Sequence, residues 1–342
     1  MRGITVHGPV ALALLLSACS RTEENVLRVG HFPNITHAQA LVGRALSREG
    51  HGWFEPRVGP AVRVEWFVFN AGPTAMEAIF ARSLDLAYVG PNPAINAHLR
   101  SRGEEIRIVA GACSGGAALV VQPDGRIKTD ADFRGKRIAT PQFGNTQDMA
   151  ARAWLLSKGF HLSISGGDVQ VVPTPNPDQL TLFQRGDVDA VWTVEPWVSR
   201  LLLEGNGKLY LEESDLWPDR RYVTTLLVSS VRLLTTRRDL LKKWIAAHVE
   251  LTEWIRANPA EAKRLVNDEL RRLTGRELPT PVLDSAWQRL ALTHDPLRAS
   301  LLKSAEDAHR LGFLPRKPDL SRIYDLTLLN DVLADKGKEK LP

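Results

Sequence analysis

The chain has 342 residues, of which 44% are hydrophobic, and a formal net charge of +5 at pH 7. That length and composition suffice for a large hydrophobic core divided between two lobes. The excess positive charge is mild and spread without basic runs, so nucleic acid is not an expected partner.

The amino terminus is typical of a secretory signal. Arg2, the apolar run PVALALLL and the small residues before Cys19 follow the order of a signal peptide, and the run is too short to span a bilayer. The boundary LSACS also resembles the lipobox of bacterial lipoproteins, in which cleavage leaves a lipid-modified Cys19 as the first residue. The alternative is an ordinary signal peptide that ends near a cysteine. We expect a signal peptide at 1–18, a linker at 19–25 and a body tethered to the membrane outside the cytoplasm.

Lipidation of Cys19 would leave Cys113 as the only other cysteine, so no intramolecular disulfide is expected. The fold then depends on its core. No later stretch has the ~20 consecutive apolar residues that a spanning helix needs.

Strand-like and helix-like runs alternate after the linker. Strands are expected at 26–32, 62–69 and 84–90, and helices at 36–47 and 70–83. Such alternation predicts an α/β protein whose mainly parallel sheets are covered by helices.

An internal repeat supports two lobes of similar construction. A shift of the chain by 104 residues lays 71–90 over 175–194 without a gap. Both copies place a proline at the first helical position, where its missing N–H does no harm. The matched pairs include Pro73 and Pro177, Met76 and Leu180, Ile79 and Phe183, Asp85 and Asp189, and Tyr88 and Trp192.

The carboxyl-terminal third is predicted to be helical. An amphipathic run covers 237–257, a second helix starts at Pro259 behind Asn258 and ends at Gly275, and a last run covers 320–337. We expect these helices to cover one lobe and assign no chemistry to them.

Three polar turns at expected helix starts are the candidate ligand contacts. They are PNITHA (33–38), NAGPTA (70–75) and FGNTQD (143–148). A helix amino terminus offers unpaired N–H groups and a partial positive charge, so it binds anions without a basic side chain. The alternative for each turn alone is an ordinary cap, but three such turns fall at the edge where open α/β sheets bind ligands. In FGNTQD, one of the four polar side chains is expected to cap the helix while the others face outward.

Other stretches add donors and pocket walls. GPNPA (90–94), GACSGG (111–116) and WTVEPW (192–197) end strands sharply. Trp192 and Trp197 are candidates for the wall of a pocket and Glu195 for an acceptor. The alternative puts both tryptophans in the core and Glu195 on the surface.

The usual catalytic and metal-binding patterns are missing from the sequence. The nine histidines are scattered, and HExxH, CxxC, GxSxG and phosphate-loop spacings do not occur. We therefore expect no catalytic residue, no metal site and no cofactor.

The lipobox, LRVGHFPNITHAQALVG, AGPTAMEAIFARSLDLAYVGPNPAI, FRGKRIATPQFGNTQD and GDVDAVWTVEPW together resemble solute-binding proteins of ABC importers in the nitrate, sulfonate and taurine family. The resemblance covers residues 26–255. It implies a two-lobed periplasmic-binding-protein type II fold with a cleft between the lobes. Lobe 1 would comprise 26–117 and 227–342, lobe 2 would comprise 118–226, and the crossings would fall near 117–121 and 224–228.

The resemblance also implies a function and a site. The chain would be a monomeric, non-enzymatic protein that captures a small organic anion, first an aliphatic sulfonate such as taurine, and delivers it to a membrane permease. Trp192 remains a wall candidate from its own sequence context. The implied ligand contacts are Asn34, Thr36, His37, Gly72, Thr74, Asn92, Ser114 and Gly115 on lobe 1, Asn145, Thr146, Gln147 and Glu195 on lobe 2, and Thr225 at the hinge.

Several alternatives remain open at this stage. Asp148 and Glu195 near the cleft favour a ligand with an amine or hydroxyl besides its anionic end. Stacking on Trp192, Tyr88 and Phe143 would instead suit a thiamine pyrimidine or another aromatic precursor. An enzyme on the same fold and an extracytoplasmic sensor domain are the alternatives from other functional classes.

Overall fold

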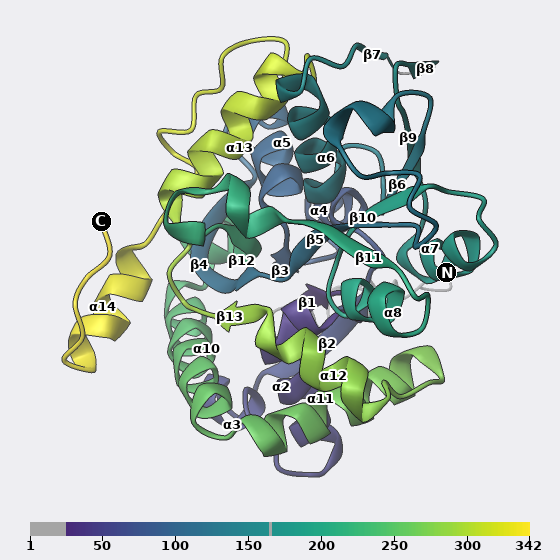
Figure 1. Ribbon diagram of the computed structural model, residues 1–342. Helices are drawn as coiled ribbons and strands as arrows, with labels where there is room; N and C mark the ends of the chain where they lie inside the picture. The colour runs from purple at the N-terminus through teal and green to yellow at the C-terminus, as the bar shows by residue number, and fades with distance from the viewer. Residues whose placement is uncertain (1–24, 164–165) are drawn as a thin grey trace, which may run out of the picture.

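The computed structural model describes residues 25–163 and 166–342. Two mixed β-sheets, one six-stranded and one five-stranded, form the centres of two lobes with helices packed around them (Figure 1). This confirms the α/β architecture expected from the alternation of strands and helices, and the two lobes expected from the internal repeat. The sheets are mixed rather than mainly parallel as expected, because β12 in sheet A and β5 in sheet B pair antiparallel with both of their neighbours. The expected signal peptide and Cys19 lie outside the described residues. Within the described part of the chain, no helix combines the length and apolar character needed to cross a bilayer.

Sheet A, the six-stranded sheet, has the order β13-β4-β12-β3-β1-β2. β1 runs parallel to both β2 and β3, whereas β12 is antiparallel to β3 and β4. The strands are β1 (Val26–His31), β2 (Arg63–Val68), β3 (Leu86–Val89), β4 (Ile106–Gly115), β12 (Val223–Ser230) and β13 (Leu290–Leu292).

Sheet B, the five-stranded sheet, has the order β11-β5-β10-β6-β9. β6 runs parallel to β9 and β10, and β5 runs antiparallel to β10 and β11. A separate small ribbon joins β7 and β8. The strands are β5 (Ala117–Val121), β6 (Arg137–Thr140), β7 (Leu162–Ser163), β8 (Gly166–Gly167), β9 (Gln170–Pro173), β10 (Ala190–Val194) and β11 (Lys208–Glu212).

The helices begin and end close to their predicted positions. The left-handed backbone of Gly275, with φ of 77°, ends α11 as expected from its place after the last helical turn. The final predicted run is helical only from Thr327. The helices are η1 (Ile35–His37), α2 (Ala38–Arg48), α3 (Glu55–Val58), α4 (Gly72–Phe80), α5 (Pro91–Arg100), η2 (Asp130–Phe133), α6 (Thr146–Ser157), α7 (Asn176–Gln184), α8 (Trp197–Leu203), η3 (Glu213–Leu216), η4 (Pro218–Arg220), α9 (Val231–Thr236), α10 (Arg238–Ala257), α11 (Pro259–Thr274), α12 (Thr280–Gln288), α13 (Arg298–Arg310) and α14 (Thr327–Asp335).

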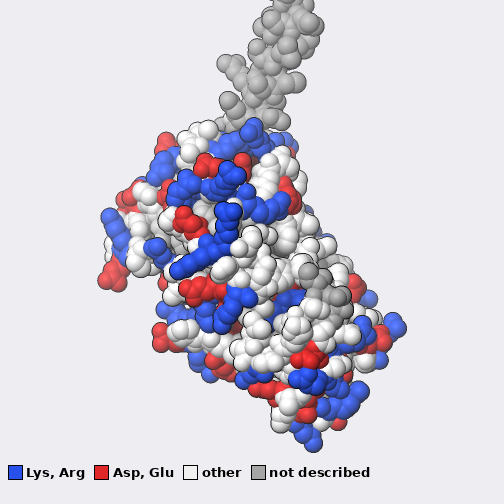
Figure 2. Space-filling model, turned by 90° about the horizontal axis from the view of Figure 1, so that it is seen from above, with Lys and Arg blue, Asp and Glu red and all other residues white. Residues whose placement is uncertain are grey.

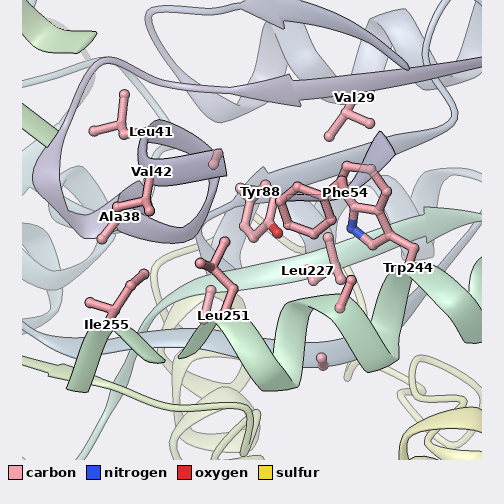
Figure 3. Close-up of a cluster of buried hydrophobic side chains, with 14 of the residues drawn as sticks. Val29, Ala38, Leu41, Val42, Phe54, Tyr88, Leu227, Trp244, Leu251 and Ile255 are labelled. Atoms are coloured by element: carbon pink, nitrogen blue, oxygen red, sulfur yellow. The ribbon is translucent and has the colours of Figure 1, made fainter. Parts of the chain in front are cut away.

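The largest core cluster fixes α10 against sheet A (Figure 3). Phe54 stacks on Trp244 of α10 with ring centroids 3.9 Å apart, and Leu251 and Ile255 continue the same buried stripe. Burying each such side chain contributes about 1.5–3 kcal/mol. This packing uses one face of the sheet and leaves the edge at the carboxyl ends of β1 and β3 free to form a site.

The chain passes between the two sheets twice. The first crossing is at Gly116, whose φ of 81° suits glycine, between β4 and β5. The second lies between β11 and β12. β12 pairs with sheet A from Val223 onward, opposite Ser114 of β4. The second lobe boundary therefore lies before Val223 rather than between residues 226 and 227 as expected, because hydrogen bonding to β4 already begins there.

The internal repeat is confirmed. The starts and ends of α4 and α7 differ by the same shift of 104 residues that aligns the two sequences. Asp85 accepts a hydrogen bond from the N–H of Arg28 at 2.9 Å, and Asp189 accepts one from the N–H of Arg137 at the same distance. Both aspartates thus tie the start of one strand to its parallel neighbour.

On the face seen from above, lysine and arginine side chains are interspersed with acidic ones (Figure 2). The view from above shows several groups of basic side chains separated by uncharged surface (Figure 2). This distribution agrees with the mild net charge of +5.

Candidate functional site

A cavity of about 40 Å³ lies between the lobes, at the carboxyl ends of β1, β3, β6 and β10. A water molecule needs roughly 10–15 Å³ on the same measure, so the space suits a few waters or one small ligand. The lining comprises Phe32, Asn34, Thr36, His37, Asn70, Ala71, Gly72, Gly90, Pro93, Pro141, Asn145, Thr146, Gln147, Asn176, Val194, Thr224 and Thr225.

Three helix amino termini from the two lobes meet at this cavity. α4 contributes its first residue Gly72, α6 contributes Thr146 and Gln147, and α7 contributes Asn176. Each helix end carries roughly half a positive charge and unpaired N–H groups. Among the described residues, no lysine, arginine, aspartate or glutamate lines the cavity. The local field is therefore positive although the wall carries no ionised side chain, which suits a bound anion.

The FGNTQD turn divides its polar side chains between structure and cavity. Asn145 Oδ1 caps α6 by accepting a hydrogen bond from the N–H of Asp148 at 2.8 Å. The Asp148 carboxylate turns inward, where it accepts from Thr140 Oγ1 at 2.9 Å and pairs with Arg152 Nε at 3.0 Å. Thr146 and Gln147 remain to face the cavity beside the capping residue.

Lobe 1 supplies neutral hydrogen-bonding side chains to the opposite wall. The Phe32 N–H lies 3.4 Å from His37 Nδ1, which places the ring proton on Nε2. Burial lowers the pKa of His37 well below 6.5, and neighbouring His31 lowers it further. Thr225 is 1% exposed and its hydroxyl has no hydrogen-bond partner within the described chain. Neutral His37 and this free hydroxyl both suit a ligand that accepts hydrogen bonds.

Contacts between the lobes close the site. Trp197 Nε1 of lobe 2 donates to Asn34 Oδ1 of lobe 1 at 3.2 Å. Phe143 contacts Phe313 with ring centroids 4.9 Å apart. A Cβ atom added to Gly90 would fall inside contact distance of Thr146 Oγ1, so a side chain here would force Thr146 or the two lobes to shift.

Two residues expected at the site serve the structure in other ways. Thr74 is exposed, and its hydroxyl donates to the carbonyl of Ala71 at 2.8 Å. Trp192 is fully buried in the core of lobe 2, and its Nε1 donates to Glu213 Oε2 at 2.7 Å. Neither lines the cavity.

Glu195 is buried rather than exposed or open to the cavity. Its carboxylate accepts from the N–H and hydroxyl of Ser199 at 3.0 and 2.9 Å and pairs with Arg289 Nε at 3.2 Å. Burial raises its pKa to about 7, although the Ser199 hydrogen bonds and Arg289 act in the opposite direction. Asp148 and Glu195 are both engaged within the protein, so neither supports the expectation of a ligand amine.

Three further predicted residues line neighbouring spaces. Ser114 and Gly115 lie in a groove beside Arg289, and Asn92 shares a small cavity with Thr146. Asn92 is 5% exposed and its Nδ2 has no hydrogen-bond partner among the described residues. It lies next to the main cavity without lining it.

Some lining residues were absent from the predicted set, and the repeat contained the signal for one of them, Asn176. Gly72 and Gly90 correspond to Asn176 and Val194 at the shift of 104 residues, and all four line the cavity. Gly72 was in the predicted set, so its repeat partner Asn176 was predictable from the shift. The remaining lining residues outside the predicted set are Phe32, Asn70, Ala71, Gly90, Pro93, Pro141, Val194 and Thr224.

Comparison with known proteins identifies the family. The model of the NMT1-like family matches residues 20–267 of the chain. The chain belongs to the NMT1-like family. A curated relative from Escherichia coli, a putative aliphatic sulfonates-binding protein, is 28% identical over 213 residues. That match covers 60% of this chain and 62% of the relative's length, so it spans less than two thirds of the relative.

Solved structures of the same fold include an alkanesulfonate-binding and a nitrate-binding protein. The alkanesulfonate-binding protein SsuA from Xanthomonas axonopodis pv. citri, bound to MOPS, has a TM-score of 0.70 at 22% identity over 88% of this chain and 98% of its own. The periplasmic nitrate-binding protein NrtA from Synechocystis PCC 6803 has a TM-score of 0.74 at 15% identity over 91% of this chain and 89% of its own. At these identities the comparison shows the fold, which is the two-lobed periplasmic-binding-protein fold expected from the sequence.

Proposed function

We propose that the protein is the extracytoplasmic solute-binding component of an ABC importer and captures a small organic anion. An aliphatic sulfonate is the leading candidate for that anion. The observation that carries this proposal is the convergence of three helix amino termini from two lobes on one cavity without charged side chains. The sulfonate-binding names of the relatives support the same class of ligand.

The lining chemistry fits a sulfonate better than a cation. A sulfonate stays ionised at physiological pH and presents three acceptor oxygens, which suits a wall of N–H and hydroxyl donors. Thr36, Thr225 and neutral His37 supply such donors beside the helix ends. The described lining has no carboxylate for an ammonium group, so we propose that an unsubstituted alkyl sulfonate binds at least as tightly as taurine.

Closure of the lobes is the proposed capture mechanism. A ligand that touches both Gly72 and Thr146 gains its full set of contacts only when the lobes meet, and this differential affinity shifts the population toward the closed form. Micromolar binding corresponds to about 8 kcal/mol, which several charge-assisted hydrogen bonds in a closed cavity can supply.

An aromatic ligand is less well supported. The stacking proposal relied on Trp192, Tyr88 and Phe143, and none of them lines the cavity. Phe32 is the one phenylalanine in the described lining, which contains no tyrosine or tryptophan. A cavity of about 40 Å³ also leaves little room for a substituted pyrimidine in this closed arrangement.

An enzymatic role is also less well supported. The described lining contains no thiol or carboxylate to act as a nucleophile or general base. Cys113 is fully buried away from the cavity, and burial raises its pKa above the usual value of 9.0. A buried thiol of this kind is a poor nucleophile.

The cellular context is part of the same proposal. Removal of residues 1–18 and lipidation of Cys19 would hold a monomeric body at the membrane beside its permease. The mass of the protein from a membrane fraction tests the anchor, since Cys19→Ser should abolish the added lipid mass.

Titration calorimetry tests the ligand class. Residues 20–342 would be titrated with ethanesulfonate, taurine, sulfate, nitrate, bicarbonate, a phosphonate and hydroxymethylpyrimidine. The proposal predicts one-to-one binding of a sulfonate. Binding of the pyrimidine alone would overturn the ligand class, and enzymatic turnover of a bound anion would overturn the capture role.

A further inference from the structure

A second candidate binding site lies outside the cavity between the lobes and shares no lining residue with it. A groove of about 550 Å³ runs between the end of α5 and the segment after α13, and its lining includes His98, Arg102, Arg316, Lys317 and Asp319. This volume falls within the roughly 300–1,000 Å³ typical of small-molecule sites. The segment after α13 runs over the top of the molecule in Figure 1, the face that carries several groups of basic side chains in Figure 2.

The positive charges of the groove are incompletely balanced. Among the lining cations, Arg100 pairs with Glu77 and Arg322 pairs with Glu104, but both acids lie outside the lining. Arg102, Arg316 and Lys317 form no ion pair within the described chain, and Asp319 is the one acidic residue in the described lining. Three cations without partners around one groove favour an anionic occupant.

His98 adds an observation that is independent of the charges. His98 is only 3% exposed, and its Nδ1 has no hydrogen-bond partner among the described residues. Burial lowers the pKa of His98, and neighbouring Arg107 lowers it further, so the ring is neutral. An unpartnered buried nitrogen in the wall of a groove is costly unless a water or a ligand completes it.

The groove also has an apolar wall. Leu99, Phe313 and Leu314 line it together with Pro315 and Pro318. An occupant that satisfies both walls carries an anionic group and an apolar part. A phosphate ester on an acyl-bearing glycerol has this chemistry, and arginine is well suited to phosphate oxygens.

The position of the groove connects it with the proposed membrane anchor. β4 runs in the same direction as β1. β1 is parallel to β3, and β12 is antiparallel to both β3 and β4, so β4 is also parallel to β3. Arg102 and Gly103 lie four and three residues before the first residue of β4, so the groove lies at the edge of sheet A where β1 also starts. Seven residues from Cys19 to Val26 span at most about 25 Å. A lipid on Cys19 would thus keep this edge close to the bilayer surface.

We propose that this groove binds the phosphate headgroup of an anionic membrane lipid. Arg102, Arg316 and Lys317 hold the phosphate oxygens, His98 supplies an uncharged hydrogen bond, and the apolar wall covers the glycerol and first acyl carbons. The membrane source depends on the proposed lipidation of Cys19, but the groove does not depend on the identity of the transported solute.

Vesicle co-sedimentation tests the proposal. The chain without its first 19 residues keeps every described element, so membrane binding can be measured without the anchor. Vesicles of phosphatidylcholine alone would be compared with vesicles containing phosphatidylglycerol. The triple variant Arg102→Ser, Arg316→Ser, Lys317→Ser should bind the anionic vesicles roughly a hundredfold more weakly, because each basic residue contributes about a fivefold factor at such a surface.

A matched control separates the groove from general surface charge. Lys208→Ser, Lys243→Ser, Arg272→Ser removes the same charge from exposed positions outside the groove. Vesicle binding lost in the groove variant and kept in the control supports the proposal. Equal loss in both variants, no preference for anionic vesicles, or calorimetric binding of glycerol phosphate to the groove without vesicle binding would each overturn it.

Discussion

Closure of the lobes over the ligand depends on the absence of a side chain at Gly90. An alanine there would place its Cβ inside contact distance of Thr146 Oγ1, and 3.4 Å from Thr146 Cβ, across the boundary between the lobes. The backbone of Gly90, with φ of −70°, accepts alanine without strain. Gly90→Ala should therefore leave each lobe intact and penalise only the closed arrangement.

The size of the penalty follows from the geometry of the clash. Overpacking by one methyl group typically costs about 1–3 kcal/mol. If the penalty falls on the closed form alone, ligand affinity drops by a factor of about 5–150. Thr146→Ala removes the hydroxyl, and its Cβ then lies at an ordinary contact distance from the new methyl group. Gly90→Ala should consequently cost little further affinity in the Thr146→Ala background, which gives a coupling of at least about 1 kcal/mol.

Titration calorimetry with the bound sulfonate, on the four proteins of this cycle, measures the coupling. Gly52→Ala is the matched control, because the nearest atoms to its Cβ would all belong to the Glu55 side chain within lobe 1. Unchanged affinity in Gly90→Ala, or an equal loss in both backgrounds, would refute the reasoning that β3 and α6 meet in the ligand-bound form.

Three further predictions concern the turn before α6 and the core beneath it. Asn145→Ala should lower the free energy of unfolding by about 1 kcal/mol through loss of the cap. Thr146→Ala should instead weaken ligand binding with little change in the thermal midpoint. A reversed pattern would contradict the roles assigned to the two residues. Asp148→Ala should cost about 3–5 kcal/mol of stability in chemical denaturation, because it leaves the Arg152 charge buried without a partner; a loss of affinity alone would make Asp148 a ligand contact. Burial raises the pKa of Glu213 from 4.5 to about 7, so the folded state binds the proton more tightly than the unfolded state and stability falls as pH rises from about 4.5 to 7. This loss of stability amounts to up to about 3 kcal/mol, and Glu213→Gln should abolish it when the free energy of unfolding is measured against pH. An unchanged dependence on pH in the variant would contradict the pKa shift.

Local patterns were sufficient to predict the two-lobed fold. The spacing of apolar residues and the punctuation by Pro259 and Gly275 depend on neighbours within one helix, so the sequence shows them directly. The shift of 104 residues carried more information still, because Asp85 and Asp189 perform the same task in both lobes.

The roles of individual polar residues were harder to predict because their partners are distant in the chain. Glu195 is engaged by Arg289, and Trp192 by Glu213, through contacts that only the folded chain brings together. Asp148 is the instructive case. Its sequence position beside the cavity residues is the same whether it faces a ligand or pairs with Arg152, and tertiary packing decides between the two.

The central claim is that helix amino termini from both lobes hold the anion. The most direct test is a titration of ¹⁵N-labelled protein with ethanesulfonate, followed through the backbone amide signals. The account predicts that the largest saturable shifts belong to Gly72 of lobe 1 and to Thr146, Gln147 and Asn176 of lobe 2, all with one dissociation constant. Shifts confined to one lobe, or saturable shifts that leave these four amides unmoved, would contradict it.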